Sequence, residues 1–241
     1  MYTLHKYPEC WGQLSLSPFC SKVEVFLKLS HIPYKVKIVN NPKKAPKRKY
    51  PVLEDAHGNI IPDSSIIMDY LFQNHALEDL KITHPKTKAH AIAFKAMIED
   101  SLYFCMLYMR WVNPEGWEIM KTVFEEKMPL PLKKVIPPLI RSSVLKAAEM
   151  QGIGRFTLDE VYDRALPQVD AIAEYMNGKD FFAGKSVSYM DAILFPFLEG
   201  IDKTPIENHI QKRLHQHTHL KEYQGRVEQL LGMSVEEKQS A

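Results

Sequence analysis

Cysteine is scarce in this chain, whose 241 residues include 3, at Cys10, Cys20 and Cys105. Three scattered thiols are too few for a disulfide framework, and no Cys-x-x-Cys pair is present to form a zinc knuckle or a dithiol redox centre. These absences favour a reducing, cytoplasmic setting.

Metal-binding clusters are also missing. His215, His217 and His219 alternate near the end of the chain, a spacing that permits a weak exposed chelate. No cysteine or carboxylate completes the coordination shell, so a polar surface segment is the favoured interpretation and we expect no metal.

The chain further lacks the features of membrane and nucleic-acid-binding proteins. Its longest apolar run is Leu102–Met109, whereas a membrane-spanning helix needs ~20 residues. Residues 1–10 contain neither the basic nor the apolar region of a leader peptide. The formal net charge of +2 gives no overall field that favours nucleic acid or an anionic membrane. We expect a soluble globular protein that inserts into no membrane.

The first part of the chain alternates strand and helix patterns. Residues 34–38 alternate apolar residues with lysines, which is the period of a β-strand, and a helical period over residues 18–30 precedes them. The predicted order is strand, helix, strand, strand, strand and helix, at residues 2–7, 18–30, 34–38, 51–55, 60–61 and from Ser64 onward. A strand–helix–strand unit implies a parallel pair with a right-handed crossover, and the tight turn at residues 56–59 makes the next pair antiparallel. The pattern predicts a compact mixed sheet flanked by helices.

The composition changes after residue 76, and no convincing strand pattern follows Thr87. The chain therefore divides into an α+β part and an all-α part. We predict a first domain at residues 1–76, a linker at 77–86, an all-helical domain at 87–232 and a polar tail at 233–241.

Helix signals mark the second part. A strongly apolar helical period runs over residues 87–111, whereas five prolines between residues 113 and 140 predict short, interrupted helices. The Thr157-x-x-Glu sequence is a capping box that opens another helix, and a second box, Ser188-x-x-Asp191, opens an apolar one.

The start of the helix at residues 18–30 carries the groups of chemical interest. Ser17 is a candidate N-cap, Pro18 suits the first helical position, and Cys20 lies in the first turn. A hydroxyl and a thiol therefore lie at the positive end of a helix dipole, where a bound thiolate is stabilised. The structural alternatives are that Ser17 is a plain helix cap and that Cys20 is a small apolar residue packed under the helix.

Three further short motifs are Tyr50-Pro51, Asp63-Ser64 and Ser188-x-x-Asp191. They resemble the cis-proline segment, the acid–serine pair at a helix N-terminus and the capping box of the helical domain in the glutathione transferase superfamily. The resemblance implies a thioredoxin-like domain followed by helices. It also implies a homodimer, because proteins of this family commonly form homodimers.

The resemblance also implies contacts with glutathione. In the family, the backbone of the residue before the cis-proline, here Tyr50 before Pro51, binds the cysteinyl part. Asp63 and Ser64 occupy the positions that hold the γ-glutamyl end, where an ammonium needs an acid and a carboxylate needs helix-end donors. Lys49, from the basic run at residues 43–49, is placed to meet the glycine carboxylate, although such a run is otherwise a solvated loop.

A narrower resemblance covers roughly residues 2–200. The sequence Ser-Pro-Phe-Cys-x-Lys-Val-Glu-x-Phe-Leu, followed by Ile-Pro-Tyr, looks like the metaxin and failed-axon-connections branch of the superfamily. The stretches at residues 99–103, 110–111 and 151–155 are similar to bacterial proteins of that branch. The resemblance is specific for fold and less so for activity.

The resemblance leads to the main functional hypothesis. Ser17 stands where omega-type glutathione transferases and glutaredoxins carry a nucleophilic cysteine, so its expected role is a hydrogen bond that lowers the pKa of glutathione's own thiol. The thiolate then attacks a small hydrophobic electrophile, a detoxification-type conjugation. The long helix lines the co-substrate cleft in this architecture, which makes Tyr103 and Arg110 candidate cleft residues.

Two other functions stay open. Cys20 falls at the second cysteine of the glutaredoxin motif, and a mixed disulfide with glutathione would make the protein a Cys20-dependent oxidoreductase. A non-catalytic interaction or scaffold module is the alternative from another class, because metaxin-like relatives are associated with adaptor roles at the mitochondrial surface. Tyr7 offers the hydroxyl used by tyrosine-type transferases, but a packed or rim tyrosine is favoured there.

Overall fold

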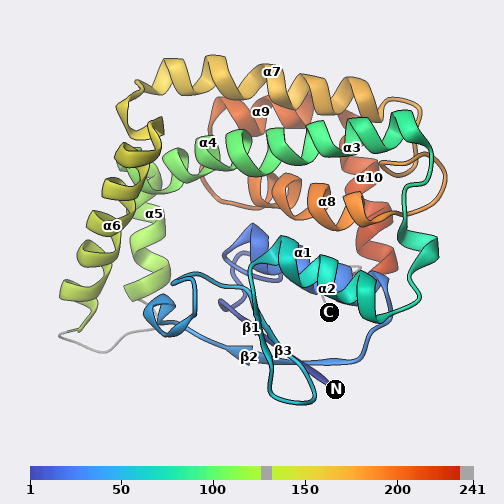
Figure 1. Ribbon diagram of the computed structural model, residues 1–241. Helices are drawn as coiled ribbons and strands as arrows, with labels where there is room; N and C mark the ends of the chain where they lie inside the picture. The colour runs from blue at the N-terminus through green and yellow to red at the C-terminus, as the bar shows by residue number, and fades with distance from the viewer. Residues whose placement is uncertain (126–131, 234–241) are drawn as a thin grey trace, which may run out of the picture. The chain divides into compact units, whose positions relative to one another are not determined.

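The computed structural model describes residues 1–125 and 132–233, and its N-terminal part is built on a four-stranded mixed sheet (Figure 1). The strand order is β2-β1-β3-β4. The β1–β2 pair is parallel, and β3 pairs antiparallel with both β1 and β4. The strands are β1 (Tyr2–Lys6), β2 (Tyr34–Ile38), β3 (Val52–Glu54) and β4 (Ile60–Pro62). The predicted strands and their directions are confirmed.

Two helices pack against each other beside this sheet, α1 (Pro18–Leu29) and α2 (Ser64–Asn74). Three apolar residues of α1, Val23, Phe26 and Leu27, are each 0% exposed. The Phe26 ring lies 5.2 Å from that of Phe72 on α2. The apolar period of α1 therefore fixes which of its faces meets the sheet and α2.

The remaining described chain is helical, and no β-strand beyond an isolated bridge at residues 181 and 184 occurs after Thr87 in residues 88–125 and 132–233. The elements are η1 (Pro42–Lys44), η2 (Glu78–Leu80), α3 (Pro85–Met97), η3 (Ile98–Leu102), α4 (Tyr103–Leu107), η4 (Tyr108–Val112), α5 (Pro114–Glu125), α6 (Leu132–Gln151), η5 (Ile153–Arg155), α7 (Leu158–Met176), α8 (Tyr189–Asp202), α9 (His209–Gln216) and α10 (Thr218–Leu230). The fold class predicted from the sequence is confirmed.

The long helix differs from its prediction in one respect. It runs without a break from α3 to η4, but η3 and η4 are π-helical turns. Because a π turn adds a residue to each turn, the buried face shifts as the helix proceeds. Ile98, Leu102 and Cys105 are fully buried as expected, and Arg110 joins them at 7% exposure.

The prediction of short, interrupted helices around the prolines is wrong for α6. This helix continues from Leu132 to Gln151 with Pro137 and Pro138 inside it. Both prolines lie in its second turn, so the hydrogen bonds that they remove are confined to the first part of the helix. Pro114 stands at the first position of α5, where it removes none.

Two compact units are distinguished by internal contacts: residues 1–91, 176–199 and 218–241 form one, and residues 92–175 and 200–217 the other. These units do not follow the predicted boundary at residues 77–86, which stays a prediction. The predicted polar tail falls almost entirely on residues 234–241, outside the described residues.

Capping boxes begin two helices where the sequence places them. The Thr157 amide donates to Glu160 Oε2 at 2.7 Å ahead of α7. Ahead of α8, the amide and hydroxyl of Ser188 donate to Asp191 Oδ2 at 2.8 and 2.9 Å. Burial raises the pKa of the Asp191 carboxyl, because the charged form is desolvated.

Candidate functional site

Ser17 stands immediately before α1 in an extended conformation, with φ −101° and ψ 121°. Its hydroxyl forms no capping hydrogen bond, so the predicted side-chain cap is wrong. The Cys20 amide, one of the donors such a cap would use, donates instead to the Ser17 carbonyl at 3.0 Å. The Ser17 hydroxyl interacts with the thiol of Cys20.

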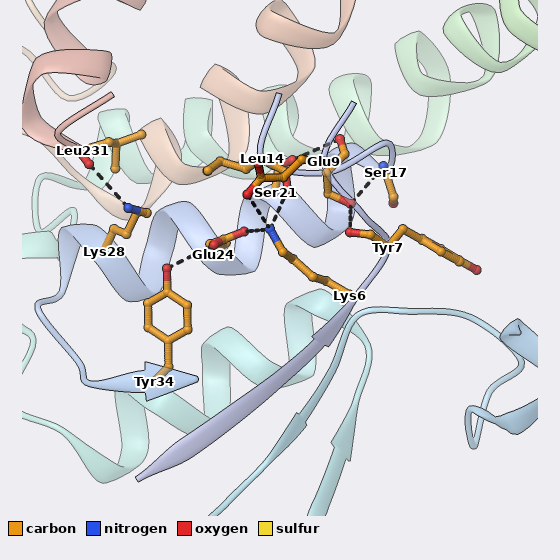
Figure 2. Close-up of polar contacts among 11 residues, drawn as sticks. Lys6, Tyr7, Glu9, Leu14, Ser17, Ser21, Glu24, Lys28, Tyr34 and Leu231 are labelled. Atoms are coloured by element: carbon orange, nitrogen blue, oxygen red, sulfur yellow. Dashed lines mark hydrogen bonds and ion pairs between the residues drawn. The ribbon is translucent and has the colours of Figure 1, made fainter. Parts of the chain in front are cut away.

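The loop between β1 and α1 is held by Ser15, which is 0% exposed. The Ser15 hydroxyl donates to the Tyr7 carbonyl at 3.0 Å and accepts from the Ser17 amide at 3.2 Å. Figure 2 labels Tyr7 and Ser17, whose backbone groups make these two hydrogen bonds. The backbone of Ser17 is therefore fixed by the loop rather than by a cap.

Cys20, in the first turn of α1, is a buried residue. It is 0% exposed and packs with Tyr50, Val52 and Ala45. Burial raises the pKa of the Cys20 thiol to about 11, and hydrogen bonds with the Tyr7 backbone and the Ser17 hydroxyl lower it by less. The thiol is protonated at neutral pH, whereas disulfide exchange requires an accessible thiolate.

The Tyr50–Pro51 peptide bond is cis, as the sequence motif predicts. Tyr50 is 9% exposed, and its ring meets the ring of Tyr7 edge-on at 5.6 Å. Because Cys20 packs against Tyr50 and interacts with Ser17, it joins the start of α1 to the cis-proline segment. The assignment of the Tyr50 backbone to glutathione stays a prediction.

Asp63 caps α2 as predicted. Its Oδ1 accepts the amides of Ser65 at 2.9 Å and Ile66 at 3.3 Å. Its φ is +80°, a conformation that costs a non-glycine residue about 1–3 kcal/mol and tends to occur at functional sites. The cap fixes the direction of the first turn of α2.

Lys22 is a residue that the sequence interpretation missed. It is 0% exposed, and its Nζ donates to the hydroxyls of Ser64 and Ser65, each at 3.1 Å. The available signal was its place in the helix: Lys22 lies four residues before the buried Phe26, on the same face. A lysine on the inner face of a helix requires polar partners.

A buried ion pair anchors the same helix. Lys6 of β1 pairs with Glu24 of α1, with 1% and 4% of their surfaces exposed. Lys6 Nζ also donates to the Leu14 carbonyl, and the Tyr34 hydroxyl donates to Glu24 Oε1 at 3.2 Å. Figure 2 shows Glu24 between Lys6 and Tyr34. Burial, with Glu24 nearby, raises the pKa of the Tyr34 hydroxyl.

The other predicted site residues lie elsewhere. Lys49 is exposed after η1. Arg110 donates through Nη2 to the Gly200 carbonyl at 2.9 Å and to Thr204 Oγ1 at 2.6 Å. Tyr103 is half-buried. The bonds of Arg110 give it a structural role, and the cleft role of Arg110 and Tyr103 stays a prediction.

The alternating histidines face different carboxylates. His215 Nε2 lies 2.7 Å from Asp202 Oδ1, and His217 Nε2 lies 3.0 Å from Asp170 Oδ1. Over residues 1–125 and 132–233, no group of three or more metal-ligating side chains is found. In the same described residues, no helix has the length and apolar character to cross a membrane.

Two family models match this chain, one for an N-terminal and one for a C-terminal domain. The glutathione S-transferase N-terminal domain matches residues 18–116, and the glutathione S-transferase C-terminal domain matches residues 167–227. The chain belongs to the glutathione S-transferase superfamily. The first match begins at Pro18, directly after Ser17, and includes the cis-proline segment and the start of α2.

Two curated relatives are similar to this chain over most of its length. It is 28% identical over 211 residues to the isoprene-epoxide–glutathione S-transferase of Rhodococcus sp. (strain AD45), which covers 85% of this chain and 88% of that protein. It is 22% identical over 195 residues to metaxin-1 of Bos taurus, covering 78% of this chain and 61% of that protein. The chain is thus similar both to a bacterial transferase and to metaxin-1, and its match spans about three fifths of metaxin-1.

Solved transferases share the fold. A glutathione S-transferase of Methylobacterium radiotolerans, in complex with glutathione sulfonate, gives a TM-score of 0.63 at 16% identity, with 100% of this chain and 97% of that chain covered. The β-etherase LigF of Sphingobium sp. strain SYK-6 gives 0.67 at 16% identity, with 97% and 99% covered. At these identities the likeness establishes the architecture.

Proposed function

We propose that this chain is a glutathione transferase that activates the glutathione thiol and conjugates it to a small hydrophobic electrophile. One observation carries the proposal: the first turns of α1 contact both segments that the family uses to bind glutathione. Cys20 packs against Tyr50 of the cis-proline segment, and Lys22 donates to Ser64 at the start of α2.

Glutathione would lie across these segments. The γ-glutamyl end meets Asp63 and Ser64, the cysteinyl backbone pairs with Tyr50 before Pro51, and Lys49 meets the glycine carboxylate. Asp63 is exposed, and its second carboxylate oxygen accepts none of the first-turn amides of α2, which leaves it an acceptor for the γ-glutamyl ammonium. The helix start supplies donors for a carboxylate.

Thiol activation is assigned to Ser17. Its hydroxyl caps no amide and already interacts with a sulfur atom, that of Cys20. A hydrogen bond to the glutathione sulfur, together with the positive end of the α1 dipole, stabilises the thiolate. Each unit by which the thiol pKa falls corresponds to about 1.4 kcal/mol. The Cys20 thiol is buried and protonated at neutral pH, so it is not proposed as the reacting group.

The name of one relative suggests a class of electrophile. The Rhodococcus protein is named for conjugation of an isoprene epoxide, so we propose alkyl epoxides alongside aryl electrophiles. The thiolate sulfur forms a bond to an epoxide carbon, the C–O bond breaks, and the resulting alkoxide takes a proton from water. A role of Tyr103 and Arg110 in holding this co-substrate belongs to the same proposal, as do a homodimer and a cytoplasmic location.

The second candidate is a non-catalytic interaction module, which the similarity to metaxin-1 favours. In that case the buried contacts around α1 serve stability alone. Measured glutathione binding separates the two candidates.

The test combines binding and catalysis. Wild type, Ser17→Ala and Cys20→Ser are compared for glutathione affinity by calorimetry and for conjugation of an alkyl epoxide and an aryl halide. We expect wild type to bind and conjugate, and Ser17→Ala to bind with conjugation reduced about 10- to 100-fold. Absence of binding at millimolar glutathione contradicts the transferase. Activity that survives in Ser17→Ala but disappears in Cys20→Ser moves the chemistry to Cys20.

A further inference from the structure

We propose that Lys22 is a positioning residue that gives this protein its selectivity for the α-carboxylate of the γ-glutamyl group, acting through the hydroxyls of Ser64 and Ser65. The inference rests on the proposed glutathione binding and adds two residues to it, Lys22 and Ser65.

The ammonium group of Lys22 donates to two neighbouring hydroxyls. Lys22 is 0% exposed, and its Nζ lies 3.1 Å from the Oγ atoms of both serines. Ser64 is 6% exposed and Ser65 is half-buried. Their adjacency at the first two positions of α2 places both hydroxyls at the end of the helix where amides point outward.

The bonds from Lys22 decide what the hydroxyls can offer a ligand. A serine hydroxyl has one proton and can also accept hydrogen bonds. Lys22 donates to each oxygen, so each serine proton turns away from the ammonium and is presented as a donor. Without Lys22, either hydroxyl is able to reverse and act as an acceptor.

The backbone completes the set of donors. Asp63 accepts the amides of Ser65 and Ile66 but not that of Ser64. The start of α2 therefore presents the Ser64 amide and two serine protons. A carboxylate accepts hydrogen bonds through two oxygens and donates none, so it matches this set, whereas an ammonium does not.

The experiment compares two peptides. One is glutathione, and the other is γ-aminobutyryl-cysteinyl-glycine, which is the same tripeptide without the α-carboxylate. Their dissociation constants are measured by calorimetry for wild type, Lys22→Met, a Ser64→Ala/Ser65→Ala double variant and the triple variant. Lys28→Met is the matched control, because Lys28 lies on the same helix and donates to the Leu231 carbonyl at 3.4 Å.

We expect wild type to prefer glutathione and Lys22→Met to weaken glutathione binding roughly 10- to 100-fold. Affinity for the shortened peptide should stay within about twofold, so the preference is lost. In the double serine background, Lys22→Met should cause no further loss. Lys28→Met should retain the preference in full.

Equal losses for both peptides would assign Lys22 a merely structural role and overturn the inference, as would a retained preference in Lys22→Met. If Lys22→Met fails to fold, the double serine variant decides: loss of the preference supports the inference, and its retention overturns it. A wild-type protein that binds neither peptide refutes the proposed function and this inference together, whereas the other failures leave glutathione binding intact.

Discussion

The two helices that flank the sheet begin in different ways. At α2, Asp63 accepts two first-turn amides and rigidly defines the helix start. At α1, Ser17 caps no amide, and its hydroxyl interacts with a sulfur atom. A capping hydrogen bond stabilises a helix, so α1 forgoes that contribution. The hydroxyl of Ser17 therefore takes no part in satisfying the first-turn amides of α1.

Buried side chains, rather than a side-chain cap, stabilise the start of α1. The buried pair of Lys6 and Glu24 ties the helix to β1, and Lys22 ties it to α2. Because these contacts lie on buried faces, they hold the helix in place without occupying the Ser17 hydroxyl. The anchoring of α1 is thereby assigned to side chains other than Ser17.

The largest expected effect comes from the anchor of α1. Glu24→Gln leaves Lys6 buried without its counter-charge, which should lower the free energy of unfolding by about 3–5 kcal/mol. Glu9→Gln is the matched control, because Glu9 is 73% exposed and 4.0 Å from the same lysine. It should cost no more than about 1 kcal/mol. Urea denaturation measures both, and equal costs contradict the assignment of the anchor to Glu24.

The next effect concerns Cys20 and pH. Its pKa is raised by burial from 9.0 to about 11, so the folded protein holds this proton more tightly than the unfolded chain. The resulting stability is complete below the unfolded pKa and is lost as the pH rises through the folded one. The unfolding free energy of wild type should fall by about 2–3 kcal/mol more than that of Cys20→Ala over this range. Parallel pH profiles for the two proteins contradict a buried thiol.

A smaller effect is expected at the start of α2. Asp63→Ala removes the cap and leaves a side chain at φ +80°, so it should cost about 1–2 kcal/mol. Asp63→Gly loses the same cap but relieves the backbone strain, and it should cost less. Thermal unfolding of the two variants tests this order. A glycine variant less stable than the alanine variant contradicts it.

The smallest effect is predicted for Ser17→Ala. With no capping bond to lose, its unfolding free energy should lie within about 0.5 kcal/mol of wild type. A loss as large as that of Asp63→Ala shows that Ser17 caps the helix in solution and removes the contrast between the two helix starts.

Local sequence signals predicted most of the fold. The alternation at residues 34–38 gave β2 its exact bounds, and Thr157 and Asp63 marked helix starts through chemistry confined to one turn. Such features depend on neighbours within a few residues, which a sequence displays directly.

What the sequence concealed depends on distant partners. From the sequence alone, three charged residues are expected at the surface: Lys6, Lys22 and Glu24. In the structure they are buried, with hydrogen-bond partners that are distant in the sequence. The missing cap at Ser17 is different, because the Ser15 hydroxyl that holds its backbone amide is only two residues away. The π turns of the long helix and the continuity of α6 through Pro137 and Pro138 have no signal in the local sequence.

The central claim is that Ser17 acts on the thiol of bound glutathione. The most direct measurement is the pKa of that thiol, followed through the ultraviolet absorbance of the thiolate in the complexes of wild type and Ser17→Ala. We expect the pKa of the bound thiol in wild type to lie at least about 1 unit below that of free glutathione, and to return toward the free value in Ser17→Ala. An identical pKa in the two complexes would contradict it.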